Sequence, residues 1–363
     1  MKSLSKCAIS TVVLGIVNGA WATLSTLGRW DISPSTTITL NTDATNGSDT
    51  ATDCLGTGTG ACKTVEGALG LAYTHFDLHG DTAPSKVKVL MGTNDSQGVH
   101  QAFHAFAGAN GGAAVMIDGG GFTMSAAAQF YFGTVIQIRN ITFTSSANCL
   151  EVLWGAKVYL LDGITFGACT GAQINIDSGA GHLEVINNYI ISGSAAYHII
   201  MASGASLYAT NGTTVSFSGA VTFTYFILVA SPAYANMQSL IYNLNGHTVT
   251  GQKGLIELNG VVLQSTSTLA VSGAVSGTGS VCRLTLASTA SLAESQRVNV
   301  ASVGGTTGCT TTSPTAVPIH IVDGTHIELT GTTFAGVYTS GGTVNIGLPG
   351  TVNPSISLGG QFL

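Results

Sequence analysis

A strand-like triplet recurs along the middle of the chain at intervals of about 24 residues. The copies stand at 141–143 (ITF), 164–166 (ITF), 189–191 (YII) and 213–215 (TTV), and each follows an Asn or a Gly. A fixed period in this range is typical of a solenoid, in which each unit buries its apolar face only by stacking on the next. The sequence therefore predicts a stack of similar coils.

Two further segments extend this pattern less regularly. A weaker copy precedes the others at 122–124 (FTM). A fifth copy at 247–249 (HTV) would require an insertion of about ten residues in one coil.

The residue types select the kind of solenoid. Leucine-rich repeats need a recurring Leu and Asn framework, and helical repeats need long segments with a 3.6-residue period; the chain shows neither. The remaining architecture is a parallel β-helix, an all-β fold. Because side chains alternate along a strand, the first and third positions of a triplet should point inward and the middle one outward. The predicted inward residues are Ile141, Phe143, Ile164, Phe166, Tyr189, Ile191 and Val215, and the predicted outward residues are Thr142, Thr165 and Thr214.

The composition favours strands and argues against two kinds of partner. The chain has 48 Gly and only 8% charged residues, where ordinary globular proteins have about 25%. The net charge is −6 with 11 Lys plus Arg, which leaves no basic stripe for a nucleic-acid backbone. No apolar run reaches the ~18 residues of a membrane span. We expect neither a nucleic-acid partner nor a membrane span.

The texture of the sequence changes at both ends of the predicted solenoid. The expected parts are an anchor or signal-like segment (1–34), a cap (35–110), the parallel β-helix (111–271), a small antiparallel β domain (272–345) and an extended tail (346–363).

The cap and the small domain contain recognisable elements. A short helix is expected at 64–73, where Thr64 can cap the first turn and Val65, Leu69, Leu71 and Ala72 form an apolar face. A strand follows at 87–91. The small domain should contain strands at 281–286, 297–300, 319–322 and 326–329, with a hairpin turn at Asp323-Gly324.

The N-terminus allows two interpretations. Lys2 and Lys6 precede the mostly apolar stretch 8–17, and Ala20-Trp21-Ala22 has the small-x-small form of a signal-peptidase site. One interpretation is a cleaved secretory signal. The other is an apolar anchor that docks on a partner protein.

Seven cysteines raise the question of disulfides. Cys54 with Cys62, and Cys282 with Cys309, could form disulfides in an oxidising compartment or remain buried thiols. Cys149 and Cys169 are predicted to be buried thiols that pack as small hydrophobes. The absence of CxxC motifs and of His residues at zinc-finger spacing argues against a metal site.

Parallel β-helices also carry polysaccharide-degrading enzymes, so the carboxylates matter. Glycoside hydrolysis usually needs two carboxyl groups about 5 to 10 Å apart. We interpret Asp162 as a turn residue, and Asp177 and Glu184 as outward, solvated residues that could approach one another. The carboxylates of the predicted coils are Asp118, Glu151, Asp162, Asp177, Glu184 and Glu257.

Two other motifs resemble sites without completing them. His100 and His104 are spaced as a helical metal pair, but the Glu of an HExxH motif is missing. The glycines at 119–121 lack the Lys of a phosphate cradle and are expected to form a turn. The sequence predicts no catalytic, cofactor-binding or metal-binding residue.

The order of segments resembles a known class of proteins. "TTITLNTDATNGSDT", a Gly-rich loop, "KTVEGALGLAY", "KVKVLMG" and the coils "ITFGACTGAQI" and "YIISGSAAYH" are similar to the right-handed parallel β-helix tail-fibre, tail-spike and head-fibre proteins of tailed bacteriophages. "VCRLTLASTASLAESQRVNVASVGGTT" with "IHIVDGTHIELTGTTF" resembles a small β domain of phage fibres. The resemblance implies a right-handed solenoid whose open end is plugged by the helix at 64–73.

The resemblance also implies a function. The expected role is a structural virion protein that forms a rigid projection and contacts the host cell surface as a homotrimer. Its partners would be other virion proteins, through the N-terminal segment, and host surface glycans. The alternatives are a tail spike that degrades polysaccharide, as a hydrolase or lyase, and a secreted bacterial β-helix adhesin. The expected location is the virion, or the cell exterior if the N-terminal segment is a cleaved signal.

Overall fold

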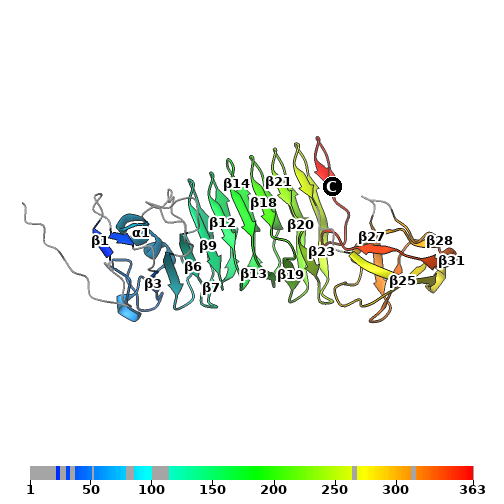
Figure 1. Cartoon of the computed structure of the whole chain (residues 1–363), viewed down its shortest axis with the longest axis horizontal. Coiled ribbons are helices and arrows are strands. Elements are labelled where there is room, and N and C mark those ends of the chain that lie inside the picture. Colours follow the sequence, from blue (N-terminus) through cyan, green and yellow to red (C-terminus); the bar gives the residue numbers. More distant parts are fainter. Residues whose placement is uncertain are drawn as a thin grey trace, which may run out of the picture.

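The chain forms a rod of stacked β-coils with a helix at one end and a small β-barrel at the other (Figure 1). The structure, a computed structural model, describes residues 22–24, 30–32, 37–50, 53–78, 86–99, 114–263, 268–311 and 316–362. Three parallel sheets form the sides of the solenoid. The predicted all-β parallel β-helix, with its capping helix and its antiparallel C-terminal domain, is confirmed.

The coils contribute strands to the three sheets in turn. The six-strand sheet contains β7 (Thr123–Met124), β10 (Thr142–Ser145), β13 (Ile164–Cys169), β16 (Tyr189–Ile191), β19 (Thr214–Phe217) and β22 (Ile241–Asn243). The seven-strand sheet contains β8 (Ala128–Phe130), β11 (Leu150–Leu153), β14 (Ala172–Asp177), β17 (Tyr197–Met201), β20 (Val221–Val229), β23 (Val249–Ile256) and β33 (Ser355–Ile356). The ten-strand sheet contains β3 (Ile38–Thr42), β5 (Val87–Met91), β6 (Val115–Asp118), β9 (Val135–Arg139), β12 (Lys157–Leu160), β15 (His182–Val185), β18 (Ser206–Ala209), β21 (Tyr234–Asn236), β24 (Val261–Leu263) and β34 (Gln361–Phe362).

The triplet repeat corresponds to the six-strand sheet. Thr142 pairs with Thr165, and Ile164 pairs with Tyr189, as the repeat predicts. The predicted fourth copy is wrong by two residues, because Tyr189 pairs with Val215 rather than with residue 213. A shift of two residues keeps the alternation of side chains, so Val215 still faces the core.

The fifth copy is also corrected. Val215 pairs with Tyr242, so this coil contains no ten-residue insertion. Val249 belongs to the seven-strand sheet, where it pairs with Val221.

Aromatic side chains stack along the interior. The rings of Phe143 and Phe166 lie 5.6 Å apart, and Tyr189 meets Phe166 edge-on at 5.8 Å. All seven predicted inward residues are buried. The predicted outward residues Thr142, Thr165 and Thr214 are partly exposed.

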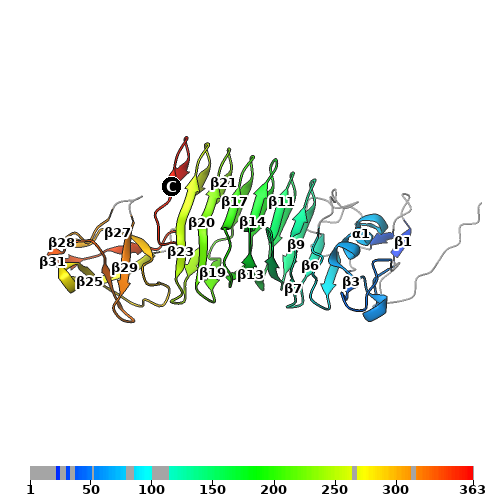
Figure 2. The ribbon, with the colours of Figure 1, turned by 180° about the vertical axis from the view of Figure 1, so that it is seen from behind.

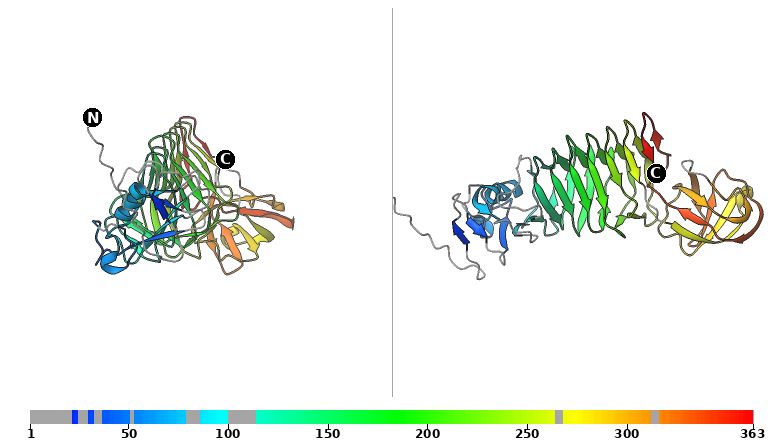
Figure 3. Two further views of the ribbon diagram at one scale, coloured as in Figure 1. Left: turned by 60° about the vertical axis from the view of Figure 1, so that its left-hand side comes forward. Right: turned by 45° about the horizontal axis from the view of Figure 1, so that its top comes forward.

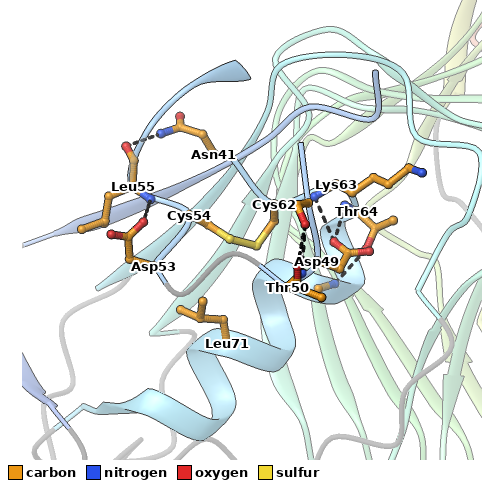
Figure 4. The surroundings of a disulfide bond; sticks show 12 residues. Asn41, Asp49, Thr50, Asp53, Cys54, Leu55, Cys62, Lys63, Thr64 and Leu71 are labelled. Carbon is orange, nitrogen blue, oxygen red and sulfur yellow. Dashed lines mark hydrogen bonds between the residues drawn. A yellow bond between two sulfur atoms is a disulfide. The ribbon is translucent and has the colours of Figure 1, made fainter. Parts of the chain in front are cut away.

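The predicted cap helix is α1 (Val65–His75), and Thr64 is its N-cap, accepting a hydrogen bond from the Gly67 N–H. Asp49 accepts hydrogen bonds from the N–H groups of Lys63 and Thr64, which holds the preceding loop against the helix (Figure 4). The buried face of α1 contains Val65, Ala68, Leu69, Leu71 and Ala72. Beside it lie the short 3₁₀ turn η1 (Gly58–Gly60) and a small sheet of β1 (Ala22–Leu24), β2 (Trp30–Ile32) and β4 (Phe76–Asp77).

The C-terminal domain is a closed antiparallel barrel in the order β25-β26-β30-β29-β27-β32. Its strands are β25 (Thr268–Ser276), β26 (Cys282–Leu286), β27 (Arg297–Ala301), β29 (Val317–Ile321), β30 (His326–Leu329) and β32 (Thr343–Asn345). Beside it lie an antiparallel pair of strands, β28 (Gly304–Thr307) and β31 (Ala335–Ser340), and the 3₁₀ turn η2 (Thr278–Ser280). The four predicted strands and the turn at Asp323 are present.

Residues 346–363 do not form the expected extended tail. The chain leaves the barrel and returns to the solenoid, where β33 pairs with β23 and β34 pairs with β24 (Figure 2). The barrel is therefore inserted between the last two coils. Figure 3 shows the returning segment at the end of the coil stack, beside the barrel.

Three disulfides link the described parts of the chain. Cys54–Cys62 lies in the loop beside α1 (Figure 4), and Cys282–Cys309 lies in the barrel. The prediction of buried thiols at Cys149 and Cys169 is wrong, because these residues form the third disulfide. The pairing of Ser145 with Cys169 across adjacent coils places Cys149 close to Cys169, with their Cα atoms 5.9 Å apart.

Candidate functional site

The outer face of the ten-strand sheet presents a run of interacting polar and aromatic side chains. Alternation buries Val158, Leu160 and Leu183 and turns their neighbours outward. Lys157 pairs with His182, and His182 with Ser206, so these side chains form one column across successive coils. The second outward column contains Tyr159, Glu184, Tyr208 and Asn236.

Glu184 lies at the centre of this face. Its carboxylate is 3.6 Å from the ammonium group of Lys157 and 3.8 Å from His182 Nε2. The Lys157 ammonium also lies 4.7 Å from the centre of the Tyr159 ring. Half-exposed ion pairs of this kind contribute only about 0–1 kcal/mol to stability. The fold therefore depends little on these ion pairs, and the side chains are available for contacts with other molecules.

The electrostatics of this face keep its histidine neutral and its lysine charged. Burial, followed by the nearby Lys157 charge, lowers the pKa of His182 despite the opposing effect of Glu184. Burial also acts to lower the pKa of Lys157, but Tyr159 and Glu184 outweigh it and the pKa is raised. At neutral pH the face carries one cation, one carboxylate and a neutral imidazole.

The order of side chains on this face is similar to that of a nucleophile, base and acid: Ser206, His182 and Glu184. Ser206 Oγ lies 2.8 Å from His182 Nδ1, but Glu184 is beyond hydrogen-bond distance of Nε2. The N–H of Ser206 already donates to the carbonyl of Gly181, so it offers no donor for an oxyanion. The arrangement presents donors and acceptors rather than a positioned nucleophile.

Aromatic rings extend the face toward the barrel. The rings of His182 and Tyr208 lie 5.6 Å apart, and those of Tyr208 and Tyr234 lie 5.7 Å apart. Tyr208 is 41% exposed. Polar groups alternate with aromatic rings along the rod, which is the composition of many binding surfaces.

The structure separates the two carboxylates that could have formed a hydrolytic pair. Asp177 ends β14 in the seven-strand sheet and accepts a hydrogen bond from the Ser178 N–H, whereas Glu184 lies in the ten-strand sheet with Lys157. Asp162 lies in a turn, as expected.

The remaining buried carboxylates have structural partners. Asp118 binds Lys88 and Arg139, and although burial opposes ionisation, these cations hold its pKa well below the usual range. Glu151 accepts hydrogen bonds from Gln129 and Asn148.

The other predicted motifs give no site in the described residues. His100 and His104 lie outside those residues, as do residues 1–21. The glycines at 119–121 form a turn, with positive φ at Gly120 and Gly121. Within the described parts of the chain, no group of three or more His, Cys, Asp or Glu side chains is arranged to hold a metal ion.

A polar network inside the solenoid was not predicted from the sequence. The Gln173 amide nitrogen donates to the carbonyls of Gly167 and Gly193, so its oxygen faces His198 Nδ1 at 2.7 Å. His198 therefore donates from Nδ1 and accepts from the Tyr189 hydroxyl at Nε2, 2.8 Å away. Burial lowers the pKa of His198 to about 3 and raises that of Tyr189. The network is a neutral structural element of the core.

Comparison with family models, with curated proteins and with solved structures finds no match to this chain. Among the described residues, no helix is both long enough and apolar enough to span a membrane.

Proposed function

We propose that this chain is a structural attachment protein of a virion, a fibre of the kind carried by tailed bacteriophages, located on the particle exterior. The observation that supports this most directly is the unbroken stack of parallel coils between two different end modules. Such a stack suits a projection that holds one end module away from its base.

The geometry makes the rod stiff. Hydrogen bonds between strands run along the rod axis from each coil to the next, and the interior is packed with apolar side chains that include stacked aromatic rings. The rod presents the outer face of the ten-strand sheet along its side and the barrel at its tip. Low charge and exposed hydroxyl and aromatic groups suit contacts with host surface glycans.

Assembly as a homotrimer is part of this proposal. The six-strand sheet exposes Ile190 and Ile241, at 40% and 41%, among outward Thr and Ser residues. In the column of Ile190 the neighbouring coils carry Thr165 and Ser216. An apolar side chain at such a position is explained by contact with another subunit.

Immunogold electron microscopy tests the location. An antibody against the barrel, residues 268–345, is applied to whole lysates of the source culture that contain both particles and cell envelopes. Labels on fibres or spikes of particles support the proposal. Labels confined to cell envelopes or to free protein overturn it.

A secreted adhesin is the second candidate, and the three disulfides favour it. Disulfides persist in oxidising compartments and are rare in the cytosol, where phage particles assemble. Mass spectrometry of the native protein distinguishes the two. An N-terminus at Thr23 supports secretion, whereas an intact N-terminal segment on purified particles supports the virion.

A further inference from the structure

One corner of the solenoid carries a residue with a left-handed backbone conformation in seven coils. It joins the seven-strand sheet to the ten-strand sheet and follows the upper tips of the coils in Figure 1. The first residue of the turn has a φ between 47° and 59° in every coil. From the helix end to the barrel end, these residues are Phe132, Trp154, Ser178, Ser203, Ser231, Leu258 and Leu358.

The two aromatic residues of this column are not required by the fold. A left-handed backbone conformation is unfavourable for bulky residues, and the three Ser residues show that a small polar side chain serves the same turn. Phe132 and Trp154 nevertheless occupy adjacent coils and are 41% and 49% exposed. Strain that the fold does not need points to a role at the surface.

The rings form one platform. Phe132 and Trp154 stack with centroids 4.9 Å apart and an interplanar angle of 24°, and Tyr131 lies 5.3 Å from Trp154. Phe132 covers one face of Trp154, so the other face is directed toward the next coil. That coil turns through Ser178 and Gly179, where a Cβ atom on the glycine would meet nothing within 4 Å. Because Trp154 is itself 49% exposed, part of its ring remains open to a flat ligand.

A partly buried hydrogen-bond chain fixes the platform. The Tyr131 hydroxyl donates to Gln129 Oε1, and Gln129 Nε2 donates to Glu151 at 3.0 Å. Asn148 donates to the other oxygen of the same carboxylate at 2.7 Å. Glu151 is only 8% exposed. The aromatic rings therefore rest on a preorganised base.

We propose that Trp154, supported by Phe132 and Tyr131, is the stacking site for a pyranose ring of a surface polysaccharide. This rests on the proposed attachment function and names its contact. One face of a pyranose carries C–H groups, which are attracted to the negative face of an aromatic ring. The ring hydroxyls remain available to Ser178 and Lys157, which lie on the next coil and the next strand.

Size and charge favour a sugar over other ligands. Phe132 and Trp154 are about half exposed, and an aromatic side chain buries about 150–250 Å² when it is fully covered. Their exposed area is therefore far less than the ~800 Å² that each partner buries in a stable protein interface. Nucleic-acid bases also stack on aromatic rings, but their phosphates need cations, and the chain carries a net charge of −6.

The test compares Trp154→Ser with Leu358→Ser. Both place at a corner position the residue that Ser178 shows to be compatible with the turn, and Leu358, at 68% exposure, is the matched apolar control. Each protein is applied to a microarray of bacterial surface polysaccharides, and affinities for retained glycans are measured by calorimetry. We expect Trp154→Ser to weaken binding about tenfold or more and Leu358→Ser to leave it unchanged.

Three outcomes overturn the inference. These are a wild-type protein that retains no glycan on the array, a Trp154→Ser protein that binds as tightly as wild type, and a Trp154→Ser protein whose oligomeric state changes in light scattering. The last result would make the platform a subunit contact. Thermal unfolding of both variants must match wild type, so that a loss of binding is not a loss of fold. The particle location found by immunogold labelling stands or fails separately.

Discussion

The solenoid and the barrel differ in what fills their interiors. The barrel buries mainly aliphatic side chains and one disulfide, with Leu284, Val298 and Ile327 fully buried, and its buried polar side chains include Gln296 and Glu328. The solenoid core also contains aliphatic and aromatic side chains, but His198 and Gln173 lie within it. A solenoid is a series of contacts between neighbouring coils, so a satisfied polar pair can specify the register of two coils locally.

The two regions also differ in how their strands are connected. Within the stack, solenoid strands pair with strands of the coils directly before and after them, whereas the barrel closes by pairing β25 with β32. A defect in the solenoid should therefore open a few coils, and a defect in the barrel should open all of it. The following predictions test that difference.

Acid should act on the solenoid first. The pKa of His198 is about 3 in the folded chain and about 6.5 when unfolded. A depressed folded pKa gives stability that is complete above the unfolded value and is lost as the pH falls toward the folded value. The loss is about 1.4 kcal/mol per pH unit, which amounts to about 3–5 kcal/mol between pH 6.5 and pH 3. Hydrogen exchange should show coils around β17 opening before the barrel.

His198→Gln is the control for this prediction. The substitution retains polar atoms but removes the titrating group, so the difference in unfolding free energy between pH 6.5 and pH 4 should shrink. An unchanged pH dependence in the variant would assign acid lability to other groups.

The disulfides should show the next largest effect. Cys149–Cys169 joins two coils and spans 20 residues, while Cys282–Cys309 spans 27 residues in the barrel. Removing either pair by double Cys→Ala substitution should cost about 3 kcal/mol. Hydrogen exchange should increase only near β11 and β13 in the first case and throughout the barrel in the second. If hydrogen exchange increased throughout the solenoid when Cys149–Cys169 is removed, the result would contradict the expected local opening of the solenoid.

The sequence predicts those features that depend on local pattern. The triplets at 141–143 and 164–166 and the strands around Asp323 were placed correctly, because alternation and turn residues determine them. The fourth triplet was misplaced because a two-residue shift leaves the alternation unchanged. The return of β33 and β34 was not predicted, since pairing between Leu255 and Ser355 depends on the path of the inserted barrel.

The candidate binding surfaces could be predicted from the sequence even less well than the fold. Lys157, Glu184 and Ser206 are far apart along the chain, and only the register of the coils brings them together. Phe132 and Trp154 are 22 residues apart (154 − 132), a spacing shorter than the period of the triplets. Their stacking depends on turn lengths that the sequence does not reveal.

Lys253 connects the solenoid to the barrel, and its buried charge should destabilise the contact between them at neutral pH. Its buried ammonium group donates to the carbonyl of Arg297 in the barrel at 2.7 Å. Burial, with a smaller effect of the Arg297 charge, lowers the pKa of Lys253 to about 7. In the unfolded chain Lys253 is protonated below about pH 10.5, whereas in the folded chain it is protonated only below about pH 7. The free-energy cost of burying Lys253 therefore grows as the pH falls from about 10.5 to about 7 and is constant below about pH 7. Lys253→Met should raise the free energy of unfolding by about 1–3 kcal/mol at pH 7.

The pH dependence separates this explanation from simple packing. The gain from Lys253→Met should disappear near pH 10.5, whereas a packing effect would persist there. Denaturant unfolding at both pH values measures the gain, and Lys63→Met, at an exposed lysine, is the control. A variant less stable than wild type at pH 7 would contradict the prediction.

The variants with the smallest expected change in stability test which region would hold the proposed trimer together. Ile190 in the solenoid and Val337 in the barrel are both exposed, at 40% and 76%. Replacing either by Thr should alter the unfolding free energy of the isolated chain by no more than about 0.5 kcal/mol. If the six-strand sheet forms the subunit contact, Ile190→Thr should shift the trimer toward monomer in sedimentation equilibrium. The substitution removes the apolar side chain between Thr165 and Ser216 and leaves a polar column on that face. Val337→Thr should leave the trimer intact. The reverse result would move the contact to the barrel and leave the rod as a spacer between assembled tips.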